Sequence, residues 1–154
     1  MLASWLLAAI HLLAFGYALA SILRRTRGLR RCRTTEDLPA VFAADNGWGI
    51  SAVVLIVTGA MRAFGGYEKG AAYYLHEPLF QLKMGVLILI LALEVGPMMA
   101  LLRWRAAYGR GDVPNLGAAP KYARISRLQA LLLVVMVFAA SGMARGIGAA
   151  AGGG

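Results

Sequence analysis

Three ionisable side chains stand inside long apolar stretches of this sequence, where they could serve a chemical purpose. Lys83 and Glu94 interrupt the stretch FQLKMGVLILILALEVGPMM, and His11 interrupts LLAAIHLLAFGYALA. A charged side chain at the centre of a bilayer costs about 2.5–3.5 kcal/mol on insertion scales, so such residues usually have a function. A lysine can bind an anionic group, and a histidine can ligate a metal or haem iron. His11 and Lys83 are therefore our first candidates for a functional site, while which residues are catalytic stays unknown at this point.

Two arginines could complete a ligand site with these residues. Arg62 and Arg145 end two further apolar stretches, within the related sequences TGAMR and SGMAR. Because His11, Arg62, Lys83 and Arg145 all fall in the same half of the predicted bundle, we expect them to form a site for an anionic ligand. The alternative is that each is a separate anchor at the membrane surface, with the Lys83 side chain extended toward water.

The elements that would position these residues are four apolar runs. They cover residues 2–23, 45–64, 78–102 and 125–144. Each is close to the roughly 20 residues that a membrane-spanning helix needs. Because 60% of the residues are hydrophobic and the runs are continuous rather than alternating, we predict an all-α fold, a four-helix transmembrane bundle. A single integral membrane domain would cover residues 1–148, followed by a flexible glycine-rich tail at residues 149–154.

The distribution of positive charge predicts the orientation of this bundle. The formal net charge is +9, and twelve of the 16 basic residues lie in two connectors, six at residues 24–33 and six at residues 103–127. Basic connectors tend to stay in the cytoplasm, so we predict a multi-pass protein of the bacterial inner membrane with both termini periplasmic. The expected partners of the connectors are anionic lipid head groups. Nucleic acid is not expected, because basic charge concentrated in the connectors is what sets the orientation of a membrane protein.

The sequences TGAMR and SGMAR also indicate an internal repeat. Thr58, Gly59 and Arg62 match Ser141, Gly142 and Arg145 at the same spacing. Both hairpins would run out–in–out, which suggests a pseudo-two-fold axis along the membrane normal. The alternative is coincidence, because small residues followed by an arginine end many membrane helices.

Other ionisable residues have less specific interpretations. Asp45 and Glu94 lie toward the inner side, where we expect them to pair with connector arginines rather than to form a proton path. Cys32 is the only cysteine and is predicted to be a reduced, incidental thiol. His76 is predicted to differ from His11 in depth by about 10–15 Å at ~1.5 Å per residue, so the two would not ligate one haem iron together. A single axial histidine remains compatible with haem binding. The alternative is that His11 only forms a hydrogen bond between two helices, which is the more common role of a lone buried histidine.

Almost the whole chain resembles the DUF2214 family of predicted bacterial membrane proteins. The stretches that carry this likeness are AAIHLLAFGYALA, TGAMRAFGGYEKGAAYYLHEPLFQLKMG, LLRWRAAYGRG and SGMARGIG. More distantly, a histidine in the first helix and a lysine early in the third are similar to the HemJ-type protoporphyrinogen oxidases and CopD-like four-helix membrane proteins. This second resemblance implies that His11 and Lys83 are functional and that haem b or a porphyrin is bound. The chain departs from the oxidases at the start of the fourth helix, where YARISRLQALLL contains no acidic residue.

Three functions follow from these patterns. The first is a haem- or porphyrin-binding membrane protein, redox-active like the HemJ-type oxidases, in which Arg62, Lys83 and Arg145 bind porphyrin carboxylates and His11 ligates iron. The second is a permeation protein for a small solute or metal ion, which would need a homo-oligomer to make a pore. The third is a non-catalytic subunit or assembly factor of a larger membrane complex. The enzyme motifs H-E-x-x-H, G-x-S-x-G and the phosphate-binding loop are absent from the sequence.

Overall fold

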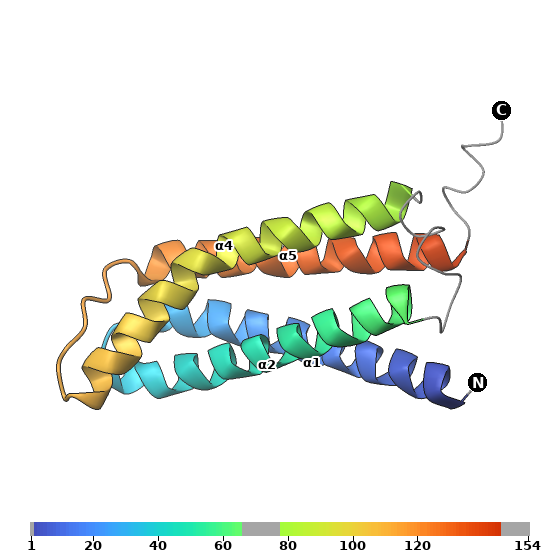
Figure 1. Ribbon diagram of the computed structural model, residues 1–154. Helices are drawn as coiled ribbons and strands as arrows, with labels where there is room; N and C mark the ends of the chain where they lie inside the picture. Colours follow the sequence, from blue (N-terminus) through green and yellow to red (C-terminus); the bar gives the residue numbers. More distant parts are fainter. Residues whose placement is uncertain (1, 66–77, 146–154) are drawn as a thin grey trace.

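The computed structural model describes residues 2–65 and 78–145, which form four long helices (Figure 1). The helices are α1 (Leu2–Arg31), α2 (Leu38–Phe64), α4 (Pro78–Gly109) and α5 (Ala119–Ala144), with a short 3₁₀ turn, η1 (Thr35–Asp37), between the first two. No strand occurs within the described ranges. All four helices are long and apolar enough to cross a membrane, which confirms the predicted all-α bundle.

Each helix continues beyond the apolar run that predicted it. The expected first span ended at residue 23, whereas α1 continues to Arg31, and α2 begins at Leu38 rather than at residue 45. With 30 residues at ~1.5 Å per residue, α1 is about 45 Å long, and a bilayer including its head groups is also about 40–45 Å thick. Hydropathy therefore marked only the part of each helix that suits hydrocarbon.

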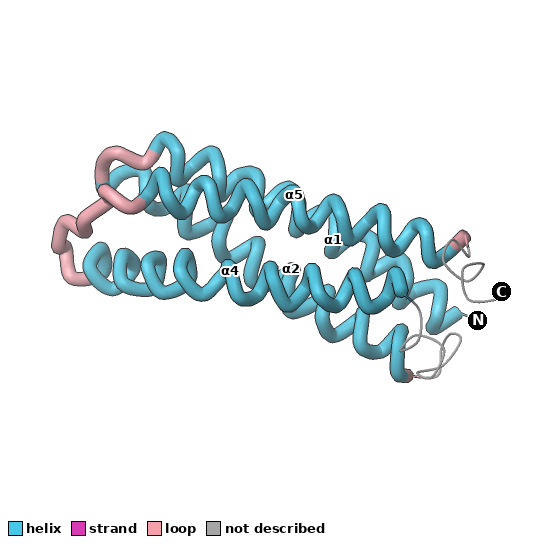
Figure 2. The backbone as a smooth tube through the Cα atoms, turned by 90° about the horizontal axis from the view of Figure 1, so that it is seen from above, coloured by secondary structure: helices cyan, strands magenta, loops and turns pink. Residues whose placement is uncertain are grey.

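The two ends of the bundle differ in what they contain. The N-terminal end of α1, the C-terminal end of α2, the start of α4 and the end of α5 lie together at one end, which we name the terminal end (Figure 1). The connectors α1–α2 and α4–α5 lie together at the opposite end, the basic end (Figure 2). This arrangement matches the predicted direction of both hairpins, while the cytoplasmic location of the basic end stays a prediction from charge.

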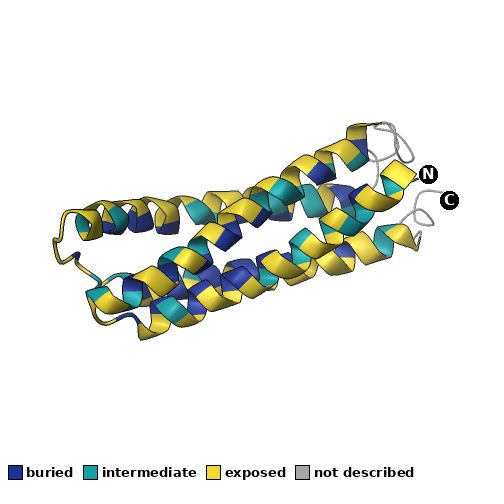
Figure 3. Ribbon diagram, turned by 90° about the horizontal axis from the view of Figure 1, so that it is seen from below, coloured by how far each residue is buried: buried dark blue, intermediate teal, exposed yellow. Residues whose placement is uncertain are grey.

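The surface of the bundle is apolar, as expected of helices that face lipid. Buried residues form inward stripes along the helices, and exposed residues cover the outside (Figure 3). Large apolar side chains such as Leu13, Ile88 and Phe138 are 73%, 67% and 75% exposed. Soluble monomers rarely expose apolar patches on this scale, so the surface is consistent with a bilayer as solvent.

Small residues bring α1 and α2 close together. Ala18 and Ser21 of α1 are small and buried. A Cβ atom at Gly47 of α2 would lie 2.6 Å from the Ser21 hydroxyl oxygen, so only glycine permits this approach. Close packing of this kind replaces the hydrophobic effect as the force between helices in a membrane.

The helices do not pack symmetrically. Within residues 2–65 and 78–145, α1 packs along both α2 and α5, and α4 packs along α5, but α2 and α4 do not pack along each other. A two-fold axis that exchanged the hairpins would require an α2–α4 contact equivalent to the α1–α5 contact. Arg62 and Arg145 do lie at the same end, as the repeat predicts. The repeat therefore describes the direction of the helices but not their packing.

The buried apolar core contains more residues at the basic end than at the terminal end. A cluster of buried apolar residues closes that end, with Leu29, Val41 and Trp104 among its members. The cluster nearest the terminal end contains only Ala63 and Phe80 as fully buried residues. Pro97 lies inside α4 and lacks the backbone N–H that would continue the helical hydrogen bonds at that point. The last part of α4 runs from α5 toward the start of α2 at the basic end (Figure 1), although within the described helices α2 and α4 do not pack along each other.

Candidate functional site

A cavity of about 1110 Å³ fills the space where α2 and α4 are apart. Its walls come from all four helices, and most of the lining residues are apolar. The ionisable lining residues are His11, Asp45, Arg62, Lys83 and Glu94. Ligand pockets are typically about 300–1,000 Å³ and are mostly apolar with a few polar groups, which is the character of this cavity.

The structure places three of the four predicted ligand-site residues on the wall of this cavity. His11 of α1, Arg62 of α2 and Lys83 of α4 all line it, and all three are half-buried. Lys83 therefore lies on an interior surface and is not a purely lipid-facing anchor. Arg145 is different: it follows the last residue of α5, is exposed, and is not among the lining residues. The ligand site of all four residues stays a prediction, with three of them on the cavity wall and Arg145 outside it at the same end of the bundle.

The His11 ring is held by a side chain of α2. Its Nδ1 atom lies 2.7 Å from the Thr58 hydroxyl oxygen. That hydroxyl lies 2.6 Å from the Val54 carbonyl oxygen, to which it donates its only proton. Nδ1 of a neutral ring must then be the donor to Thr58, which leaves the ring lone pair on Nε2. This tautomer follows from the hydrogen-bond network, and it is the form in which a histidine ligates iron through Nε2.

The floor of the cavity is built on a buried arginine. Arg25 of α1 is fully buried, and each of its five N–H bonds has an acceptor. Its two terminal nitrogens lie 2.7 and 2.8 Å from the two carboxylate oxygens of Glu94, a bidentate ion pair. Other bonds reach Asp45 at 2.8 Å, Ser126 at 3.1 Å and Gln129 at 2.9 Å. We name these five residues, drawn from all four helices, the Arg25 cluster.

Further donors complete the cluster. Trp48 Nε1 donates to a Glu94 oxygen at 3.1 Å, and Gln129 donates to the same oxygen at 2.8 Å. Arg105 of α4 donates to Asp45 at 2.9 Å. With Arg105 counted as a sixth member, the Arg25 cluster contains two arginines and two carboxylates and is electrically neutral. In the part of the chain that the structure describes, no buried side-chain nitrogen or oxygen lacks a hydrogen-bond partner.

The cluster confirms one prediction and corrects another. Asp45 and Glu94 do pair with arginines that the sequence placed in the connectors, namely Arg25 and Arg105. However, Arg25 was expected in a loop that contacts lipid head groups, and it lies inside α1 with no exposed surface. The missed signal was its register: Ala18, Ser21 and Arg25 follow at steps of three and four, which places them on one helix face. Two acidic residues within apolar runs also required a counter-charge at their own depth.

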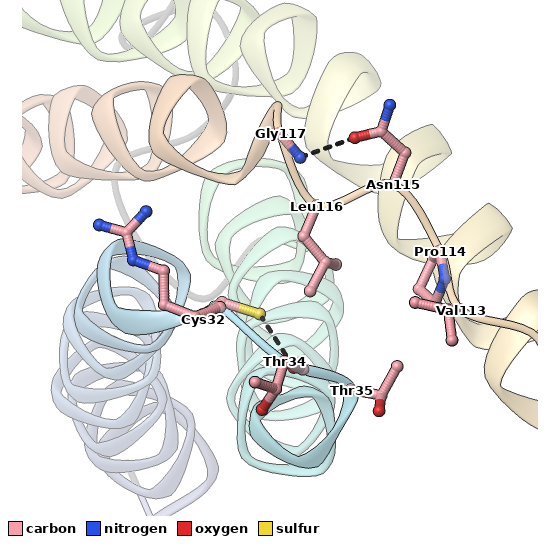
Figure 4. A pocket seen from close by; sticks show the side chains of 9 residues that line it. Cys32, Thr34, Thr35, Val113, Pro114, Asn115, Leu116 and Gly117 are labelled. Carbon is pink, nitrogen blue, oxygen red and sulfur yellow. Dashed lines mark hydrogen bonds between the residues drawn. The ribbon is translucent and has the colours of Figure 1, made fainter.

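A second, smaller hollow of about 400 Å³ lies at the basic end, between Cys32 and the α4–α5 connector (Figure 4). The Cys32 thiol faces the Thr34 carbonyl oxygen at 4.0 Å, and Asn115 accepts a hydrogen bond from the Gly117 backbone N–H at 2.9 Å (Figure 4). Burial, reinforced by the nearby Asp37 carboxylate, raises the pKa of the Cys32 thiol. Because the thiolate is the reactive form, this cysteine is poorly suited to nucleophilic chemistry.

Two other predictions concern residues that the structure does not describe or groups that it does not contain. His76 and the tail at residues 149–154 lie outside the described ranges. Among the described residues there is no group of three or more His, Cys, Asp or Glu side chains that could hold a metal ion. A haem iron needs only one protein ligand if the porphyrin supplies the others, so His11 remains the candidate metal ligand.

Comparison with known proteins gives one match. The family of predicted membrane proteins designated DUF2214 matches residues 3–148. This chain belongs to the DUF2214 family. No curated protein and no solved structure matches the chain. Membership in DUF2214 assigns a membrane protein without an activity, and the likeness to HemJ-type and CopD-like proteins stays a prediction.

Proposed function

We propose that this DUF2214 protein binds a carboxylated porphyrin, with haem b as its metal-containing form, in the cavity between α2 and α4. The observation that carries the proposal is that His11, Arg62 and Lys83, from three different helices, line one large apolar cavity. A porphyrin is a large, flat, apolar ring with carboxylates at one edge. It therefore needs both an apolar space and cationic groups at one end of that space.

The apolar walls favour a flat ligand. On the α2 side the cavity is lined by small residues that include Gly49, Ala52, Gly59 and Ala60. A Cβ atom at Gly59 would lie 3.4 Å from Cε1 of His11, so a larger residue there would crowd the ring. These residues leave room for a planar molecule beside α2, with the histidine at its face.

The cationic groups favour carboxylates at the terminal end. Arg62 lies in the last turn of α2 and Lys83 in the second turn of α4, both near that end of the bundle. At the opposite end of the cavity, the carboxylates of Asp45 and Glu94 are neutralised by Arg25 and Arg105. Cationic side chains therefore line the terminal end of the cavity, whereas the carboxylates at its other end are bound by arginines. This polarity would orient a porphyrin with its carboxylates toward Arg62 and Lys83.

The histidine geometry fits an iron-containing porphyrin. A metal-ligating histidine usually donates its other ring N–H to a partner that fixes its tautomer, and Thr58 accepts such a bond from His11 at 2.7 Å. Bound haem would supply one-electron redox chemistry, which is the basis for assigning an oxidoreductase activity. The residues of this chain would hold the ring, orient it and exclude water from it.

A titration tests this function. We expect the protein in lipid nanodiscs to bind haem with one-to-one stoichiometry, producing a saturable shift of the Soret band, and to bind metal-free protoporphyrin in competition with haem. Protoporphyrin dimethyl ester, which has the same ring without the negative charges, should bind at least about tenfold more weakly, corresponding to about 1.4 kcal/mol for the lost ion pairs. The variant Arg145→Gln serves as a control for the effect of charge alone, because it removes a positive charge at the same end of the bundle but outside the cavity. It should bind haem as the unchanged protein does. Absence of saturable binding, or equal binding of the ester, would contradict the proposal.

A further inference from the structure

The cavity has a side opening between α2 and α4. Several lining residues are also exposed on the surface of the bundle: Gly49, Ile56 and Ala60 on α2, and Leu91 and Met98 on α4. Lining residues of α1 and α5, such as Leu12 and Val137, are exposed as well. However, among the described residues α1 packs along α2 and α5, and α5 packs along α4, whereas α2 and α4 do not pack along each other, so the side opening is assigned to the gap between α2 and α4. The five residues of α2 and α4 named above are apolar or glycine and present no side chain that would hold water at this mouth.

Contacts between α2 and α4 close the opening on the side of the basic end. At the basic side, Trp48 donates to Glu94 at 3.1 Å and Arg105 binds Asp45 at 2.9 Å. Farther toward the basic end, the rings of Phe42 and Tyr108 pack edge to face. These contacts join α2 to α4 across the floor of the cavity.

A second contact closes the opening on the side of the terminal end. Ala63 of α2 and Phe80 of α4 are buried together in the apolar cluster at the terminal end. The opening is therefore a window. Trp48 and Glu94 bound it toward the basic end, and Ala63 and Phe80 bound it toward the terminal end. Trp48 and Ala63 are fifteen residues apart in one helix, which is about 22 Å at ~1.5 Å per residue. A window of that height lies largely within the roughly 30 Å hydrocarbon layer of a bilayer.

We infer that the cavity is filled sideways from the membrane, through this window, by molecules dissolved in the bilayer. The inference rests on the proposed function only for the identity of the bound molecule, an amphiphile with an anionic group. Charge complementarity supports that class, because Arg62 and Lys83 lie at the terminal end of the cavity and the window below them is apolar. When no such ligand is bound, lipid acyl chains would occupy the same space.

Trp48 provides a reporter for this route. It lines the cavity, yet its side chain is only 5% exposed, so lipid can reach it mainly from within the cavity. The chain has three tryptophans, and Trp5→Phe with Trp104→Phe leaves Trp48 as the only one. In vesicles of lipids brominated on the acyl chains, we expect the emission of Trp48 to be strongly quenched, and more so than by acrylamide added to the water.

Two glycine substitutions make the test specific to the window. A Cβ atom at Gly49 would meet no atom within 4 Å, so Gly49→Leu should be accommodated while its side chain obstructs the mouth next to Trp48. Gly85→Leu is the matched control, because Gly85 is an equally uncrowded helical glycine that does not line the cavity. We expect Gly49→Leu to reduce the quenching by about twofold or more, since quenching needs atomic contact, and Gly85→Leu to leave it unchanged.

The results that would overturn the inference are distinct from those that would overturn porphyrin binding. Weak quenching by brominated lipid, stronger quenching by acrylamide, or equal effects of the two leucine substitutions would exclude lateral access. A second copy or another protein that covers the window would give weak quenching by brominated lipid. The measurement needs no porphyrin, so a protein that fails the haem titration can still show lateral access. A protein that binds haem can likewise fail the quenching test.

Discussion

Arg25→Met is expected to destabilise the folded protein by about 3–5 kcal/mol, the usual cost of removing one partner of a buried ion pair. The substitution removes all five hydrogen bonds that the guanidinium donates and leaves Glu94 without a cationic partner in the cluster. Asp45 keeps its bond to Arg105. The cluster thus changes from neutral to a net charge of −1 inside the bundle.

Unfolding in detergent, followed by circular dichroism with increasing temperature or denaturant, measures this loss. Arg24→Met is the matched control, because Arg24 is the neighbouring arginine and is exposed. The double variant Arg25→Met/Glu94→Gln should recover part of the lost stability, because it restores neutrality and leaves only the Arg105–Asp45 pair. Equal stability of Arg25→Met and Arg24→Met would show that the Arg25 cluster does not support the fold.

His11→Ala and Lys83→Met are expected to impair ligand binding in different ways. His11→Ala removes the proposed iron ligand, so it should shift or abolish the Soret band of bound haem while leaving the affinity for metal-free protoporphyrin nearly unchanged. Lys83→Met removes a cation that would bind a carboxylate. This variant should lower the affinity for both haem and metal-free protoporphyrin by about tenfold to a hundredfold, because a hydrogen bond to a charged group contributes about 1.5–3 kcal/mol.

Absorption and fluorescence titrations of the two variants separate these roles. Lys83→Arg is not expected to restore full affinity, since the planar guanidinium has a different shape and different hydrogen-bond directions from an ammonium group. Unfolding curves serve as the check that each variant is intact. An unchanged haem spectrum in His11→Ala would exclude His11 as the iron ligand, and unchanged affinity in Lys83→Met would exclude the lysine from the site.

The sequence was sufficient to predict the helices and their directions. Membrane spans follow from the length and composition of apolar runs, since a backbone without water must satisfy its own hydrogen bonds. The pairing of Asp45 and Glu94 with basic residues was predictable for a similar reason: a lone carboxylate at that depth would be too costly.

Other features depended on packing that a single sequence does not specify. Arg25 belongs by sequence to a run of arginines, and its bonds to Glu94 and Asp45 on neighbouring helices could not be assigned from its register on the α1 face alone. Arg145 repeats the spacing of Arg62, yet it does not line the cavity. The repeat also does not extend to the packing, because in the part of the chain that the structure describes α1 and α5 pack along each other whereas α2 and α4 do not.

The central claim is that the cavity between α2 and α4 holds a porphyrin with its iron at His11. The most direct measurement is a crystal structure of the full chain grown with haem, with anomalous diffraction data collected at the iron absorption edge. We predict one iron peak inside the cavity, about 2 Å from Nε2 of His11, as is usual for a metal–imidazole bond, with the porphyrin carboxylates toward Arg62 and Lys83. An ordered haem on the surface of the bundle, or an iron peak away from His11, would contradict the account.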